Sequence, residues 1–245
     1  MVPGPGADRR AAPSDEAPAA GWAWVLLPVS WCAWLLAWLV PSLLLAPHIV
    51  LPRPWMTAET APAAALAAGA LFLVVAWPFW PALAGRAGRV GGPGAARWIG
   101  LSVLEFVTLV ALALPFGLVA WSVGGWTLEA GPTAAVVAGL GLFGLGLRVA
   151  AAGMAPAASR WLMLAATLAC VLPPALEYAA GETLGVGFPR VLEASPVVAL
   201  VRVAAEGWPA ESWPEIARLW LWPGVGVVLA LVGVLESRRR GRAAS

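Results

Sequence analysis

Long apolar runs alternate with short polar segments along the chain, and six of the runs are long enough to cross a membrane as helices. These runs cover approximately residues 21–46, 63–85, 98–123, 133–152, 159–179 and 217–236. A helix of about 20 apolar residues spans the hydrocarbon core of a bilayer, because each residue adds about 1.5 Å. The pattern predicts an all-α protein with six transmembrane helices, a flexible tail over residues 1–20 and a basic tail over residues 237–245.

One apolar run between the fifth and sixth predicted spans is too short to cross. Residues 193–207 read EASPVVALVRVAAEG, and the uncharged stretch from residue 194 to 201 would rise only about 12 Å as a helix. Ser195 followed by Pro196 is a favoured helix start, with serine as the N-cap and proline as the first helical residue. We therefore expect short outer helices in an interfacial or re-entrant segment over residues 190–215.

The arginines set the predicted orientation. All 15 basic residues are arginines, and placing the N-terminus in the cytoplasm puts all of them on that side except Arg53, Arg190, Arg202 and Arg218. An excess of positive charge marks the cytoplasmic loops, so both termini are predicted to lie inside. With 61% hydrophobic and 11% charged residues, the composition indicates an integral membrane protein. Arginine without lysine, with abundant Ala, Gly and Pro, points to a GC-rich bacterial genome and to the bacterial cytoplasmic membrane.

The sequence predicts no catalytic, cofactor-binding or metal-binding constellation. The single histidine, His48, falls in a predicted outer loop, and Cys32 and Cys170 lie in apolar runs, where we expect small buried side chains. Asp8 and Asp15 are the only aspartates, and their place in the N-terminal tail excludes an intramembrane aspartyl protease. The motifs HExxH and GxSxG are absent. We therefore predict a protein that is not itself an enzyme.

A glycine-rich stretch in the fourth predicted span matches a nucleotide-binding pattern only superficially. GLGLFG, residues 139–144, fits GxGxxG, but a dinucleotide site requires this motif between a strand and a helix of a soluble unit. We interpret Gly139, Gly141, Gly144 and Gly146 as a face of small residues that lets this helix pack closely on a neighbour.

Glu105 is the candidate polar site within the membrane. It follows Trp98 by seven residues, about 10 Å of helix, which places it in the third span toward the cytoplasmic end. A carboxylate at this depth is costly; it couples ions or protons, reaches toward the interface, or bonds to a neighbouring helix, and we favour the bond. Arg148 and Glu177 lie near the ends of their predicted spans, and we interpret both as interfacial.

Several local features together resemble the membrane subunits of type-2 ATP-binding-cassette (ABC) exporters. Glu105 near the start of the third span is followed by Pro115 and by the pair Gly124–Gly125, the segment EASPVVAL lies between the fifth and sixth spans, and the basic tail ESRRRGR follows the sixth. The resemblance implies a bacterial permease that forms a translocation path in the lipid bilayer with a second copy or a related permease. A separate ATP-binding subunit would hydrolyse ATP.

The resemblance also implies roles for two groups of residues. Arg86, Arg89 and Arg97, in or beside the cytoplasmic loop between the second and third spans, would contact the ATP-binding subunit. Ser195 and Pro196 would belong to an outer gate. No cofactor and no nucleic-acid partner is implied.

Three other functions stay open at the level of the sequence. The chain could be a non-catalytic subunit or assembly factor of another bacterial membrane complex. It could be a secondary transporter that uses Glu105 for coupling, although residues 21–123 and 133–236 show no convincing inverted repeat. It could also be a membrane enzyme, for which only His48, Glu105 and Glu177 would be available.

Overall fold

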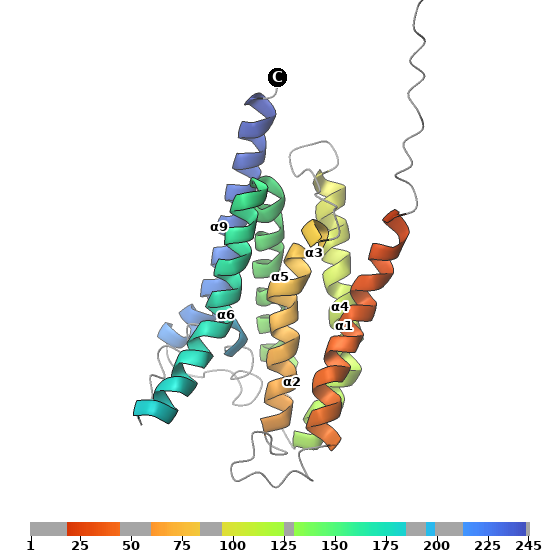
Figure 1. The fold of residues 1–245 in the computed structure, drawn as a ribbon, viewed down its shortest axis with the longest axis vertical. Coiled ribbons are helices and arrows are strands. Elements are labelled where there is room, and N and C mark those ends of the chain that lie inside the picture. The colour runs from red at the N-terminus through yellow and green to blue at the C-terminus, as the bar shows by residue number, and fades with distance from the viewer. Residues whose placement is uncertain are drawn as a thin grey trace, which may run out of the picture.

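The computed structural model describes residues 19–44, 60–83, 95–124, 130–184, 195–198 and 213–243. Every element in these ranges is helical, which confirms the all-α class predicted from the sequence. The elements run in a bundle along a common long axis (Figure 1). Their bounds are α1 (Ala19–Leu44), α2 (Thr60–Leu71), the π-helical turn η1 (Phe72–Ala76), α3 (Trp77–Leu83), α4 (Ala95–Gly124), α5 (Ala130–Gly153), α6 (Pro156–Leu184) and α9 (Trp213–Ala243).

Four helices are long and apolar enough to cross a membrane. They contain the segments 96–119, 133–153, 156–176 and 220–242, and two shorter apolar segments, Val25–Val40 and Leu66–Pro81, lie in α1 and in the run from α2 to α3. These lengths are compatible with a membrane-embedded protein. The six-span topology and the cytoplasmic location of both termini stay predictions.

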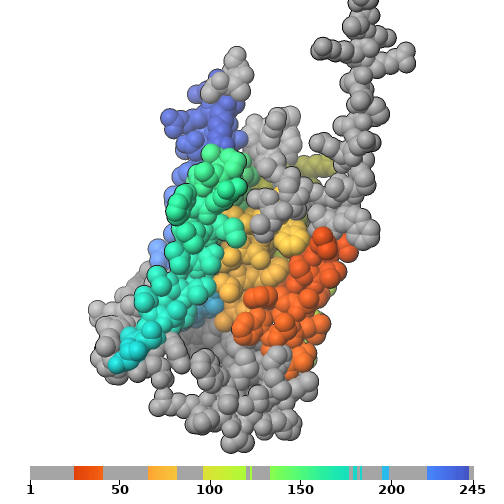
Figure 2. All heavy atoms as spheres, in the orientation of Figure 1, coloured from red at the N-terminus to blue at the C-terminus, as the bar shows by residue number. Residues whose placement is uncertain are grey.

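The described helices bury two groups of apolar side chains. One group joins α2, η1 and α3 to α5, α6 and Val197, and includes Phe143 and Cys170. The other joins α1 and α4 to the same α2–α3 run, and includes Trp31 and Leu109. The continuous helical run of residues 60–83 therefore connects both groups, and on the face seen in Figure 2 it lies between α1 and α6.

Helix α5 is the most enclosed of the four long apolar helices. Within its candidate span 56% is buried, compared with 11% in α4 and α6 and 17% in α9. Its closest neighbour is α9, because Gly146 faces Gly226 and Gly153 faces Gly233 so closely that a Cβ at either α5 position would overlap the opposing backbone. The two contacts are seven residues apart on both helices, which is about two helical turns. This confirms that small residues allow the fourth predicted span to pack closely on a neighbour.

The π-helical turn η1 ends at Ala76, two residues before Pro78. The Trp77 backbone N–H donates to the carbonyl of Phe72, five residues back, as in a π-helix. Proline has no N–H, and in a regular helix its ring would clash with the carbonyl four residues earlier, at Val74. The wider π turn accommodates Pro78 without ending the helix.

Helix α9 continues past the end predicted from the sequence. Residues 237–243, assigned above to a basic tail, extend the helix to Ala243. Helix α1 begins at Ala19, within the tail predicted over residues 1–20. The rest of that tail lies outside the described ranges, as do His48, Arg86, Arg89 and most of segment 190–215.

Candidate functional site: an ion pair enclosed by tryptophans

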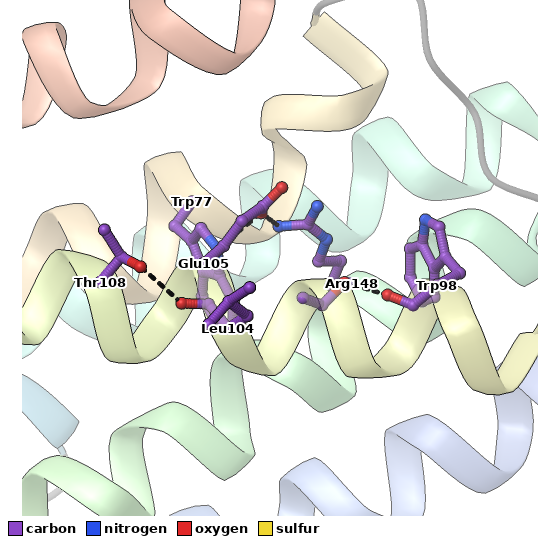
Figure 3. A network of polar contacts seen from close by, with 7 residues as sticks. Trp77, Trp98, Leu104, Glu105, Thr108 and Arg148 are labelled. Atoms are coloured by element: carbon purple, nitrogen blue, oxygen red, sulfur yellow. Dashed lines mark hydrogen bonds and ion pairs between the residues drawn. The ribbon is translucent and has the colours of Figure 1, made fainter.

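Glu105 on α4 and Arg148 on α5 form an ion pair inside the bundle. The Arg148 Nη1 lies 2.6 Å from the Glu105 Oε2. The Arg148 side chain is only 6% exposed and the Glu105 side chain only 12%. Figure 3 shows the carboxylate and the guanidinium reaching toward one another from their two helices. The intramembrane carboxylate is therefore bonded to a neighbouring helix, the alternative that the sequence analysis favoured for Glu105.

Two tryptophans surround the Arg148 guanidinium. Its Cζ lies 5.4 Å from the ring centroid of Trp77 and 5.6 Å from that of Trp98. Both distances fall within the roughly 6 Å at which a cation is attracted to an aromatic face. The Trp77 Nε1–H also donates a 3.3 Å hydrogen bond to the Glu105 Oε2. Helices α3, α4 and α5 thus meet at one polar cluster, which we call the Glu105–Arg148 site.

The spacing of residues on α4 explains how the helix presents its part of this site. Trp98, Ser102 and Glu105 follow one another at four and three residues, so they share one face of the helix. Ser102 is 1% exposed, and its hydroxyl donates to the Trp98 carbonyl at 3.0 Å. The buried serine hydroxyl therefore has its hydrogen-bond partner within α4 itself.

On α5, glycines provide the space that the site needs. Gly144 lies one turn before Arg148, and a Cβ there would lie 2.8 Å from the Trp77 ring. Gly141 lies one turn further, and a Cβ there would lie 2.5 Å from the Phe106 ring. Such distances are closer than packed atoms tolerate, so these positions require glycine for the aromatic rings to reach α5. The four predicted glycines therefore do not form one face: Gly139 and Gly146 face α9, whereas Gly141 and Gly144 face rings of α4 and α3.

The Glu105–Arg148 site is suited to holding helices together. A buried charge is tolerated only when it is paired, and in a membrane such pairs face the interior of the bundle. Among the described residues, Glu105 is the carboxylate paired with Arg148, while the buried Arg148 Nε has no hydrogen-bond partner there. Within the described part of the chain, no group of three or more His, Cys, Asp and Glu side chains could hold a metal ion.

A second polar contact involves the segment that the sequence analysis treated as an outer gate. The Ser195 hydroxyl donates a 2.9 Å hydrogen bond to the backbone carbonyl of Cys170 on α6. In a regular helix that carbonyl would accept from residue 174, but Pro174 has no N–H to donate. Ser195 is 0% exposed and Pro196 is fully buried beside it. The serine hydroxyl therefore satisfies a carbonyl that a proline leaves without its helical partner.

The helix start predicted at Ser195 and Pro196 is present. Residues 196–198 are helical and Ser195 directly precedes them. The serine hydroxyl donates to another helix, which the sequence analysis did not foresee. Val197 joins the apolar group around Phe143 and Cys170, so the start of this segment is inserted into the bundle.

The remaining candidates are placed differently. Arg97 is exposed in the first turn of α4, about 12 Å of helix from Glu105, while Arg86 and Arg89 lie outside the described residues. Of the cysteines, Cys170 is buried as expected, whereas Cys32 is half-buried.

The sequence analysis interpreted Arg148 as an interfacial residue, but its side chain is buried inside the bundle. Arg148 is 5% exposed, and it is the only charged residue in α5, as Glu105 is the only acidic residue in α4. Two lone opposite charges on neighbouring spans are the sequence signal that could have indicated the pair. Trp77 carried no comparable signal, because the chain has 16 tryptophans.

Comparisons with models of known protein families, with curated proteins and with solved structures find no match to this chain.

Proposed function

We propose that the chain is the membrane-spanning permease subunit of a bacterial ABC exporter, located in the cytoplasmic membrane. Six helical segments, α1, the α2–α3 run, α4, α5, α6 and α9, would form one half of a translocation path. A second copy or a related permease would supply the other half, and a separate subunit would hydrolyse ATP.

The observation that carries this proposal is the insertion of Ser195 and Pro196 into the bundle. Cys170, which accepts the Ser195 hydrogen bond, lies 14 residues from each end of α6, Pro156 and Leu184. It is thus about 21 Å along the helix from its start, and a span that begins at Pro156 would hold it within the roughly 30 Å of a hydrocarbon core. A short helix that enters the membrane just before the last span is the feature expected of an outer gate in such a permease.

The Glu105–Arg148 site favours a translocation path that couples no ion over an ion-coupled transporter. A coupling carboxylate must exchange its cation during the transport cycle, whereas Glu105 is held by Arg148 and also accepts from Trp77. The energy for transport would then come from a partner, as it does in an ABC exporter. This arrangement argues against the secondary transporter and against an enzyme centred on Glu105.

The test is purification of the tagged, full-length chain from its native membrane in mild detergent, followed by mass spectrometry of the associated proteins. We expect a stoichiometric ATP-binding subunit whose ATPase activity depends on the permease. A stable complex of other membrane proteins without any ATPase would contradict the proposal. That result would support the alternative, a non-catalytic subunit or assembly factor of another membrane complex.

A further inference from the structure

The C-terminal turns of α9 carry a dense group of arginines directly after its apolar surface ends. Leu231 and Leu235 are each 59% exposed, as expected for side chains facing lipid tails. The helix then continues to Ala243 and projects beyond the nearby ends of α5 and α6 (Figure 1). Four exposed arginines follow, and we call them the arginine cluster: Arg238, Arg239, Arg240 and Arg242.

The arginine cluster has a net positive charge. Among the described residues, Glu236 lies 3.3 Å from Arg239, whose side chain is 80% exposed. One carboxylate beside the three consecutive guanidinium groups of Arg238, Arg239 and Arg240 leaves an excess of two positive charges in this part of the helix. Phosphate is a favoured partner for such groups, because a guanidinium presents two parallel N–H donors to its oxygens.

The positions of the arginines relative to Leu235 place them at the level of phospholipid headgroups. Arg238 lies about 4.5 Å and Arg242 about 10.5 Å further along the helix axis than Leu235. The polar layer on each side of a bilayer is roughly 5–8 Å thick. Flexible arginine side chains can cover the difference by extending back toward the membrane surface.

The distribution of the arginines around the helix favours lipid over a protein partner. Successive residues turn by about 100°, so Arg238, Arg239 and Arg240 cover about 200° of the circumference, and Arg242 falls between the first two. A folded partner docks against one face of a helix and would leave part of this arc unused. Lipid headgroups surround a membrane helix on every open side.

We infer that the arginine cluster binds the headgroups of anionic phospholipids in the leaflet that surrounds the end of α9. Zwitterionic headgroups offer the same phosphate, but their own cation offsets its charge. The preference should therefore be for lipids such as phosphatidylglycerol. This inference requires only that α9 is inserted in a membrane, and it holds whether or not an ATP-binding subunit exists.

The test places a reporter beside the cluster in the full-length chain. The native cysteines are replaced (Cys32→Ala and Cys170→Ala), Ala244→Cys is labelled with a fluorophore, and the protein is reconstituted in phosphatidylcholine nanodiscs. Spin-labelled phosphatidylglycerol or spin-labelled phosphatidylcholine is added at equal amounts as quencher. We expect stronger quenching by phosphatidylglycerol, and a preference that falls about fivefold for each arginine removed in Arg238→Gln/Arg240→Gln.

Two variants separate specific binding from a general effect of charge. Arg97→Gln/Arg160→Gln removes the same charge from exposed positions on α4 and α6 and should leave the preference unchanged. Arg238→Lys/Arg240→Lys should retain most of it. Equal quenching by both lipids in the parent protein, or an equal loss in the Arg97/Arg160 control, would overturn the inference.

Two further outcomes would reassign the cluster. Soluble glycerol phosphate that abolishes the preference would show a phosphate site independent of the bilayer. Loss of a co-purifying protein in Arg238→Gln/Arg240→Gln, with the lipid preference intact, would assign the cluster to protein docking. Either result would overturn the assignment to lipid.

Discussion

At the scale of single residues, the described bundle is held by a few polar contacts that cross between helices. The Glu105–Arg148 site joins α4 to α5, and Ser195 joins a short inserted helix to α6. Both contacts satisfy groups that would be costly to leave alone in an apolar surrounding: a charge in one case and a backbone carbonyl in the other. Their loss should therefore cost much more than the loss of comparable contacts at the surface.

Removal of one member of the buried ion pair should strongly destabilise the protein. We expect Glu105→Gln to lower the free energy of unfolding by about 3–5 kcal/mol, because it leaves Arg148 buried without its counter-charge. The double variant Glu105→Gln/Arg148→Gln should be more stable than the sum of the two single losses predicts. Reversible denaturation in detergent micelles, analysed as a double-mutant cycle, measures both effects.

The matched control for this cycle is Glu236→Gln, which breaks an exposed Glu–Arg pair on α9. Because solvent screens exposed pairs, its cost should be within about 1 kcal/mol. A Glu105→Gln cost as small as that of Glu236→Gln would show that the Glu105–Arg148 pair does not stabilise the bundle.

The proposed reason for the Ser195 hydrogen bond can be tested by restoring the missing donor. Ser195→Ala should cost about 1–3 kcal/mol, because it leaves the buried Cys170 carbonyl without a partner. Pro174→Ala supplies a backbone N–H in the position from which a helix normally bonds that carbonyl. Ser195→Ala should therefore cost much less in the Pro174→Ala background, as measured by unfolding in micelles. Equal costs in the two backgrounds would show that Pro174 is not the reason for the bond.

At the scale of elements, close backbone approach determines how α5 packs. Gly146 and Gly153 face Gly226 and Gly233 on α9, while Gly144 faces the Trp77 ring. These contacts use different faces of α5, which is consistent with its central and most buried position. The helix can carry the lone charge of Arg148 because its neighbours come near enough to enclose it.

A methyl group at the α5–α9 contact should separate the two helices. Gly146→Ala places a Cβ against the backbone of Gly226, which cannot give way as a flexible side chain would. Overpacking of this kind costs about 1–3 kcal/mol or more. Gly224→Ala on α9 is the matched control, since a Cβ there meets nothing within 4 Å, and it should be neutral or slightly stabilising. Thermal unfolding in detergent compares the two, and similar midpoints would contradict the close contact.

The local pattern of the sequence predicts the helices well, but it does not predict which residues meet. Apolar length is a local property, so the runs around 98–123, 133–152 and 159–179 correspond to α4, α5 and α6. The pairing of Glu105 with Arg148 joins residues 43 positions apart and depends on which faces the helices turn toward one another. The π-helical turn before Pro78 likewise depends on whether the bundle holds the helix together across a proline.

At the scale of the whole molecule, the number of membrane crossings decides where the chain presents its charges. Six crossings place the arginine cluster of α9 on the same side as Arg97 and Arg160, and a seventh crossing between α6 and α9 would separate them. The insertion of Ser195 to the depth of Cys170 fits a segment that enters the membrane and returns to the side from which it came.

Labelling on both sides of Ser195 distinguishes a re-entrant segment from a seventh span. Single cysteines are introduced as Gly187→Cys or Ala210→Cys in the chain that carries Cys32→Ala and Cys170→Ala, and intact cells are treated with a membrane-impermeant maleimide. Both positions fall in the outer connection predicted from the sequence, so both should be labelled from outside. Arg97→Cys is the control and should be labelled only after the membrane is opened, because an excess of arginine marks the cytoplasmic side.

If only one of positions 187 and 210 is labelled in intact cells, the segment crosses the membrane. An outer gate and a shared side for Arg97 and the arginine cluster would then both be ruled out.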